Sequence, residues 1–311
     1  MSIRCLLPFL AASLFGQVAI QQFPDKITVD IGGKPFTALW IGADVRKPYL
    51  YPVYAASGKN VLRNWPMEKV AGETNDHPHH RGIWFNHGDV NKIDFWSSDP
   101  LARNDNGSKI AVKKIRQVKG GAKKGVIAGD FEWVDKAGTV LLREARTMTF
   151  QAEGDQRMVD FDIQLTAVEA VKFGDTKEGS FGLRLADPLK EQKASGKMTN
   201  AEGKVGEKAV WGRPSPWVDY AGTLEGEQLG ITIMDHPTNP GHPTHWHARA
   251  YGLFAANIFG LHDFYNDKSK DGSVSLKAGG TMRFRYRVMI HPGDTASSNI
   301  GEAYKKFAAM K

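Results

Sequence analysis

Two short segments of the chain hold eight of its ten histidines, and imidazole is the side chain best suited to proton transfer near neutral pH. Asp76–Asp89 and His236–His247 each contain four histidines among prolines and glycines. Such segments form loops or irregular strand ends, where functional side chains tend to lie. We therefore expect the two segments to share one pocket, with His79, His80 and His247 as acid–base candidates.

A carboxylate and a set of aromatic and polar side chains complete the candidate site. Glu178 is the natural carboxylate partner for a histidine, although an isolated glutamate before a glycine is equally compatible with a turn. Aromatic rings can stack on the apolar face of a sugar, and polar side chains can bind its hydroxyls. The candidate substrate-binding residues are Arg81, Trp84, Asn86, His87, Asp94, Trp96, Arg184, Trp246, Arg249 and Tyr251. Of the nearby aromatic residues, Phe95 and Phe254 are expected to belong to the core.

The same histidines permit a metal site as the alternative. In an extended segment, His77 and His79 project to one face and His80 to the other. His77, His79 and His247 could then supply nitrogen ligands for zinc or copper. The spacing does not match the helical His-Glu-x-x-His motif. We expect no cofactor, with a divalent metal as the open alternative.

Composition indicates a folded globular protein. Hydrophobic residues make up 41% of the 311 positions and charged residues 24%, which excludes disorder and collagen-like repeats. A single cysteine excludes a disulfide framework and a thiolate zinc cluster. The net charge of +7 permits an anionic partner without requiring one. The basic segment Lys113–Lys124 has no aromatic residue, so we interpret it as a solvated hairpin and expect no nucleic-acid partner.

Residues 1–20 have the pattern of a signal peptide. One positive charge in Met1–Arg4 precedes the apolar run Cys5–Phe15, which is too short to span a bilayer. Cleavage is expected between Gly16 and Gln22; the alternative is a buried first strand or helix. No later stretch approaches the ~18 apolar residues of a membrane-spanning helix. We expect a periplasmic or secreted protein with no membrane span after signal removal.

Alternating apolar and polar residues predict an all-β fold. The predicted strands are Lys26–Ile31, Thr37–Ile41, Val126–Val134, Val140–Phe150, Arg157–Thr166, Gly230–Met234 and Met282–Ile290. A helix over Ser297–Met310, capped by Asp294 or Thr295, is expected at the C-terminal end. The absence of βαβ alternation argues against a doubly wound nucleotide-binding sheet. The sequence thus predicts a single domain over residues 21–311, a large antiparallel β-sandwich with a short C-terminal helix.

Three long motifs resemble a known family. They are His77–Asn91 with Asp94–Trp96, Arg46–Val53, and His242–Gly260. Together they are similar to the signature of bacterial proteins labelled "methane oxygenase PmoA-like", with departures at Lys92 and His245. The resemblance covers nearly the whole mature chain and implies an exported β-sandwich protein of glycan-degrading bacteria. It does not imply the membrane subunit of particulate methane monooxygenase, which needs several spanning helices. The motifs are also similar in style to galactose-mutarotase-like supersandwiches.

These observations predict a carbohydrate-active enzyme, a hydrolase, lyase or epimerase, that uses histidine acid–base chemistry on a glycan or other small molecule. One histidine of the first segment is expected to act as acid or base, with Glu178 or His247 as its counterpart and Arg81 or Arg184 holding the substrate. Histidine titration would then produce a limb of the pH profile between about pH 5 and 8. The alternatives are a copper- or zinc-dependent enzyme or oxygenase, and a non-catalytic glycan-binding module.

Overall fold

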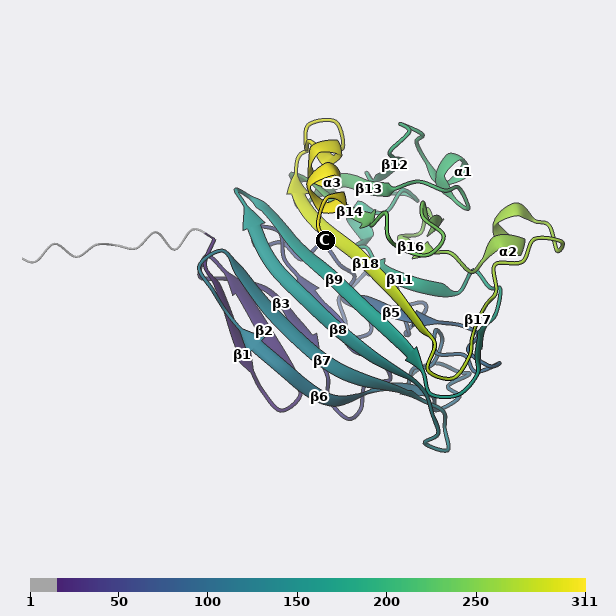
Figure 1. Cartoon of the computed structure of the whole chain (residues 1–311). Helices are drawn as coiled ribbons and strands as arrows, with labels where there is room; N and C mark the ends of the chain where they lie inside the picture. The colour runs from purple at the N-terminus through teal and green to yellow at the C-terminus, as the bar shows by residue number, and fades with distance from the viewer. Residues whose placement is uncertain (1–15) are drawn as a thin grey trace, which may run out of the picture.

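The computed structural model describes residues 16–311, which form two eight-stranded antiparallel sheets (Figure 1). The first sheet is ordered β1 (Val18–Gln22), β2 (Lys26–Ile31), β3 (Lys34–Trp40), β4 (Tyr49–Val53), β5 (Ile83–His87), β11 (Gly179–Arg184), β16 (Leu253–Asn257) and β15 (His245–Ala248). The second is ordered β12 (Lys197–Asn200), β13 (Trp217–Leu224), β14 (Glu227–Asp235), β18 (Thr281–Pro292), β9 (Gln156–Ala167), β8 (Val140–Glu153), β7 (Lys124–Val134) and β6 (Lys109–Lys119).

Short elements connect the sheets. A two-stranded ladder joins β10 (Val171–Phe173) to β17 (Val274–Leu276). The helices are α1 (Glu207–Val210), α2 (Leu261–Tyr265) and α3 (Ile300–Ala308), with a 3₁₀ turn at Asp187–Leu189. All seven predicted strands are present, with ends that differ by a few residues. The predicted β-sandwich with a short C-terminal helix is confirmed.

One large apolar core lies between the sheets, because each strand turns alternate side chains inward. In β18, Met282, Phe284, Tyr286 and Val288 belong to this core. The intervening arginines face outward. There Arg287 binds Asp160 and Arg283 binds Asp162, and both aspartates belong to the neighbouring strand β9. The period of two in the sequence therefore separates the inner from the outer face of this strand.

Helix α3 covers part of the outer face of the second sheet. Its Ile300 and Phe307 pack on Met158, Met234 and Met289. The helix begins at Ile300 rather than at the predicted Ser297, and neither expected capping residue precedes it directly. Asp294 instead closes a turn with the Ser297 amide, and the Thr295 hydroxyl donates to Asp219 of β13. These contacts delay the start of the helix.

The predicted signal peptide lies mostly outside the described residues, which begin at Gly16. Strand β1 starts at Val18, whose side chain is buried and pairs with Ile31 of β2. The boundary expected at residue 20 therefore falls within a strand of the first sheet. Between residues 16 and 311, no helix has both the length and the apolar character needed to cross a bilayer.

Candidate functional site

The candidate site lies on the outer face of the first sheet, above one row of cross-strand neighbours. Trp84 of β5 pairs with Gly182 of β11, Gly182 with Ala255 of β16, and Ala255 with His247 of β15. The Trp84 ring lies over Gly182, where an added Cβ would approach the ring carbon Cζ2 to 3.1 Å. The two small residues therefore leave room for Trp84 to lie flat as a floor.

Three further rings stack on Trp84 to form a column. His80 stacks on Trp84 with a centroid separation of 5.2 Å, His77 on His80 at 4.8 Å, and Tyr251 on His77 at 5.7 Å. The His79 ring meets the His80 ring edge-on at 4.4 Å. Each stacked pair is within 10° of parallel.

The column exists because the segment is a turn and not an extended strand. The His80 amide donates to the His77 carbonyl oxygen at 3.0 Å, and His77 has a φ of +42°. The expectation that His80 would project away from His77 is therefore wrong. The turn brings both rings to the same side.

Both histidine segments reach one hollow of about 440 Å³, a volume within the range of small-molecule sites. Its walls come from the 77–80 turn, the turn after β5, the residues before β11, and β15 with its following loop. The lining residues are His77, His79, His80, Asp94, Trp96, Ser97, Lys177, Glu178, His247, Arg249 and Tyr251. The predicted convergence of the two segments is thus confirmed, and Glu178 joins them.

Two of the imidazoles have opposite hydrogen-bonding polarity. His247 Nδ1 lies 2.8 Å from the Lys177 carbonyl oxygen, which can only accept, so Nδ1 carries the proton and Nε2 a lone pair. His80 Nδ1 lies 3.3 Å from a guanidinium nitrogen of Arg184, which can only donate, so the His80 proton is on Nε2. The pair thus offers one acceptor and one donor.

Burial keeps these imidazoles neutral. It lowers the pKa of His79 and of His247 to about 3, and it lowers the pKa of His80 well below its usual value. Neighbouring positive charges, Lys47 for His79 and Arg249 for His247, act in the same direction. With pKa values this far below neutrality, these three histidines are not expected to produce a limb of the pH profile between pH 5 and 8.

An ion-pair network holds the turn from behind. The Asp76 carboxylate accepts hydrogen bonds from Arg63, from Arg184 at 2.9 Å and from His77 Nδ1 at 3.1 Å. Burial raises the pKa of Asp76, but the His77 hydrogen bond and the charge of Arg184 outweigh it, so that pKa is well below its ordinary value. The guanidinium of Arg184 also lies 4.6 Å from the Tyr251 ring centroid. Arg184 is thus a buried support of the hollow and not part of its lining.

Lys47 supports the opposite wall. Its ammonium group donates to the carbonyl oxygens of Trp96 at 3.1 Å and Ser98 at 3.4 Å. Burial lowers the pKa of Lys47 to about 8. Asp94 shapes the same wall by accepting the amides of Trp96 and Ser97. Glu178 is different, because 39% of its side chain is exposed and it forms an ion pair with Lys177 Nζ at 3.4 Å.

Sequence reasoning missed several of these residues. Lys177 and Ser97 line the hollow, while Asp76, Arg63 and Lys47 support it. Asp76 is the first residue of the first histidine segment and Lys47 lies within the Arg46–Val53 motif, so position in the sequence was an available signal for both. Nothing in the sequence marked Arg63.

Six predicted substrate-binding residues do not line the hollow. Trp84 lies buried beneath His80, Arg184 supports the hollow from behind, and Arg81 is paired with Asp99. Asn86 is buried and donates to the Phe95 carbonyl oxygen. Successive residues of a strand point to opposite faces of the sheet. His87 is three positions from the outward-facing Trp84, and Trp246 is one position from the outward-facing His247, so both lie on the inner face. Trp246 belongs to the core, as do Phe95 and Phe254, which were expected there.

The remaining histidines of the second segment bind elsewhere. His236 binds the Met310 carbonyl oxygen at 3.1 Å, and His242 binds Asp235 at 2.7 Å. His245 Nε2 lies 3.1 Å from the Tyr265 hydroxyl of α2. Of the four histidines in this segment, His247 alone lines the hollow.

The alternative metal ligands are not assembled. His77 Nδ1 is committed to Asp76 and His247 Nδ1 to the Lys177 carbonyl oxygen. Within the described part of the chain, no three His, Cys, Asp or Glu side chains are grouped as a metal site would require. The set His77, His79 and His247 shares the hollow without converging on one point.

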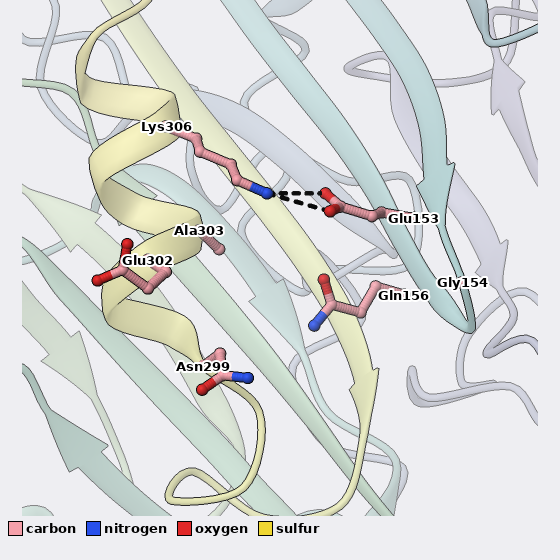
Figure 2. Close-up of a pocket in the computed structure, with 7 residues that line it drawn as sticks. All are labelled: Glu153, Gly154, Gln156, Asn299, Glu302, Ala303 and Lys306. Atoms are coloured by element: carbon pink, nitrogen blue, oxygen red, sulfur yellow. Dashed lines mark hydrogen bonds and ion pairs between the residues drawn. The ribbon is translucent and has the colours of Figure 1, made fainter.

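A second hollow lies between the β8–β9 turn and α3 (Figure 2). Lys306 reaches across it to Glu153 at 3.0 Å, an exposed ion pair. Its lining contains no histidine and no aromatic residue. Its carboxylates, Glu153 and Glu302, pair with Lys306 and Lys305 at the exposed surface, so this hollow lacks the buried imidazoles and aromatic rings of the first.

Comparison with known proteins gives a family and a fold. Residues 26–305 match the family described as "Family of unknown function (DUF6807)". No curated protein sequence matches the chain significantly.

Solved structures with a similar arrangement include galactose 1-epimerase from Lactobacillus acidophilus NCFM, 10% identical with a TM-score of 0.39, covering 91% of this chain and 100% of that one. A galactose mutarotase-like protein from Lactobacillus casei ATCC 334 is 8% identical with a TM-score of 0.40, covering 88% and 100%. An α-galactosidase from Lactobacillus brevis is 8% identical with a TM-score of 0.43, covering 89% of this chain and 39% of that one. At these identities the likeness concerns the fold alone.

Proposed function

The chain belongs to the family of unknown function DUF6807. We propose that it is an enzyme that moves protons to and from a carbohydrate substrate. The observation that carries the proposal is the pair of neutral imidazoles with opposite polarity at one hollow. A base must be unprotonated at working pH, and a donor must keep its proton there. His247 Nε2 meets the first requirement and His80 Nε2–H the second.

The roles follow from these tautomers. His247 Nε2 accepts a proton from the sugar, and His80 Nε2–H donates a hydrogen bond to the oxygen on which negative charge develops. Burial raises the pKa of Tyr251 to about 12, so its hydroxyl stays protonated and serves as a second donor. The Glu178 carboxylate accepts a hydrogen bond from a substrate hydroxyl. His77 and His79 complete the wall.

The carboxylates favour an epimerase or lyase over a hydrolase. Glycoside hydrolases commonly use two carboxyl groups that flank the scissile bond. In the lining described here, Asp94 is engaged by two backbone amides, which leaves Glu178 as the available carboxylate. One base, one donor and one carboxylate suit removal of a proton from carbon or from a sugar hydroxyl.

The test is a proton NMR screen of neutral and acidic sugars in deuterium oxide. Removal of a proton from carbon appears as deuterium incorporation, and anomer interconversion as exchange between the two anomeric signals. His247→Gln is expected to lower the rate by about 10²- to 10⁴-fold, because it removes the base and keeps similar bulk. His245→Gln is the matched control, since His245 lies on the same strand outside the hollow. An active protein whose rate is unchanged by His247→Gln would contradict the proposal.

Binding without turnover would favour the glycan-binding module instead. Titration calorimetry with the same sugars distinguishes this outcome, because a module binds a sugar and shows neither exchange reaction. Export to the periplasm or medium and kinship with PmoA-like proteins remain part of the proposal. Detection of the mature protein in a periplasmic fraction tests the first of these.

A further inference from the structure

The net charge of the protein is concentrated on one hairpin. Lys109–Lys124, which spans β6 and the turn into β7, contains seven Lys or Arg residues and no acidic residue. Its charge of +7 equals that of the whole chain, so the rest of the molecule is balanced. Figure 1 shows β6 at the open edge of the second sheet, beside β7.

Two β-bulges turn the cations outward. Ile110, Val112, Ile115 and Val118 face or pack against the core, at spacings of two, three and three residues. The pairing with β7 skips one residue after Val112 and one after Ile115. Each bulge therefore adds an outward position to an otherwise alternating strand. The six cationic side chains from Lys113 to Lys124 are exposed.

Most of these cations lack an acidic partner. Lys113 pairs with Glu132 at 3.5 Å and Arg116 with Asp130 at 3.0 Å, both on β7. Within residues 16–311, no carboxylate lies within ion-pair distance of the four others, Lys114, Lys119, Lys123 and Lys124. Like charges close together repel each other, and an anion bound among them removes that repulsion.

Protection of an exposed sheet edge explains only some of the unpaired lysines in this hairpin. Lysines on an edge strand discourage pairing with other chains, which accounts for the cations of β6 itself. Lys123 and Lys124 lie beyond the end of β6, and Lys124 faces outward from β7. They extend the basic surface around the turn, where no open edge needs protection.

We propose that Lys114, Lys119, Lys123 and Lys124 form a binding surface for a linear anionic polysaccharide. The exposed cations follow one strand and its turn, and a linear polymer with repeated carboxylates or sulfates can neutralise several of them at once. Single-stranded nucleic acids are bound through aromatic stacking, and Lys109–Lys124 has no aromatic residue. The preference for a polysaccharide rests partly on the proposed function, whereas the basic surface does not.

The experiment measures affinity for polygalacturonate and dextran sulfate, with neutral dextran and double-stranded DNA as comparison probes. The test variant changes Lys114, Lys119, Lys123 and Lys124 to Gln. The matched control changes Lys69, Lys197, Lys268 and Lys277 to Gln, which removes the same charge from exposed positions elsewhere. Circular dichroism establishes that both variants fold.

The test variant is expected to bind each anionic polysaccharide roughly tenfold more weakly, or worse, with the slope of log K against log salt reduced by about three to four. The control variant is expected to change affinity by less than about twofold, because its lysines lie outside the surface. Equal losses in both variants would overturn the proposal, as would tighter binding of DNA than of either polysaccharide. No binding to either polysaccharide at low salt would overturn it too.

His247→Gln separates this inference from the proposed function. The variant is expected to keep full affinity for dextran sulfate while losing turnover of sugars, because the hollow and the hairpin are different surfaces. If the protein binds the polysaccharide but shows no activity on any sugar, the result supports the proposed binding surface and contradicts the proposed function of the hollow. Loss of binding in His247→Gln counts against the surface.

Discussion

Each imidazole of the hollow that has a partner is oriented by a group of fixed polarity. A carbonyl oxygen can only accept, a guanidinium can only donate, and a carboxylate beside two arginines stays ionised. These partners decide which nitrogen of His247, His80 and His77 carries the proton. The chemistry available at the hollow therefore depends as much on Lys177, Arg184 and Asp76 as on the histidines themselves.

At neutral pH, nitrogen NMR of the imidazoles is expected to show His247 protonated on Nδ1 and His80 on Nε2. A depressed pKa means that the neutral form is present above that pKa and is lost as the pH falls through it. Because the pKa of His247 is lowered to about 3, its spectrum is expected to stay constant from pH 8 down to pH 5. A histidine of ordinary pKa would titrate within that range. A midpoint near pH 6.5 for His247 would contradict the assignment.

The register of the strands in the first sheet places the residues of the site side by side. Trp84, Gly182, Ala255 and His247 share one row, and the small residues let a tryptophan lie flat beneath the histidine column. A change in residue size within this row is transmitted through Trp84 to His80. The site is therefore sensitive to substitutions that do not touch a substrate.

Gly182→Ala is expected to destabilise the protein by about 1–3 kcal/mol and to weaken sugar binding. The added Cβ approaches Trp84 and the Ala255 Cβ, both to 3.1 Å, so the floor must shift. Gly301→Ala in α3 is the matched control, since a Cβ there meets nothing within 4 Å and alanine favours a helix by about 0.5–1 kcal/mol. Chemical denaturation and calorimetry measure both effects. Equal stability of the two variants would show that the row tolerates a methyl group.

Strand β1 of the first sheet overlaps the end of the predicted signal peptide. Chains that begin at Gln17 and at Phe23 differ by one strand and by the buried Val18. The shorter chain is expected to be less stable by about 2 kcal/mol or more, because burying a valine contributes about 1.5–3 kcal/mol. Denaturant unfolding measures the difference. We expect the mature protein to begin at or before Gln17, and terminal sequencing that finds Phe23 would contradict this.

A buried cluster outside the hollow links β18, β13 and the segment that precedes α3. His291 of β18 binds Asp219 of β13 at 3.0 Å, and its Nδ1 lies 2.6 Å from the Ser298 hydroxyl. Ser298 donates to the carbonyl oxygens of Pro292 and Asp294, so its proton is engaged by the backbone. The Ser–His–Asp arrangement is therefore a clamp that fixes the approach to α3. An accessible nucleophile would need a free hydroxyl.

The clamp predicts a stability that falls at alkaline pH. Burial lowers the pKa of His291, but the hydrogen bond and charge of Asp219 outweigh it and raise that pKa. A raised pKa contributes stability that is complete below the unfolded value of about 6.5 and is lost as the pH rises through the folded value. The difference in unfolding free energy between the native protein and His291→Gln is therefore expected to shrink as the pH rises above about 6.5. A constant difference from pH 5 to 9 would contradict the charged clamp.

The sequence by itself determined the fold class and the two segments that form the site. The period-two alternation in β18 predicts which of its side chains face the core. Turn residues and β-branched runs predict strands β7, β8 and β9 and the order in which they pair. The clustering of histidines among prolines and glycines located the hollow, although each segment also contributes a strand to the first sheet, β5 from the first and β15 from the second.

Only the tertiary structure decided which residues of those segments face the hollow. Trp246 and His247 are neighbours in sequence, yet one is in the core and the other in the site, and the register with β16 decides this. The turn that stacks His77 on His80 and the burial that keeps the histidines neutral arise from contacts with Arg63, Arg184 and Trp84. Arg184 is 104 residues from His80, and even the nearer partners face the histidines only once the chain has folded. Which nitrogen of an imidazole carries the proton, and how deeply the ring is buried, depend on the residues that surround it. Those neighbours are known only after the chain has folded.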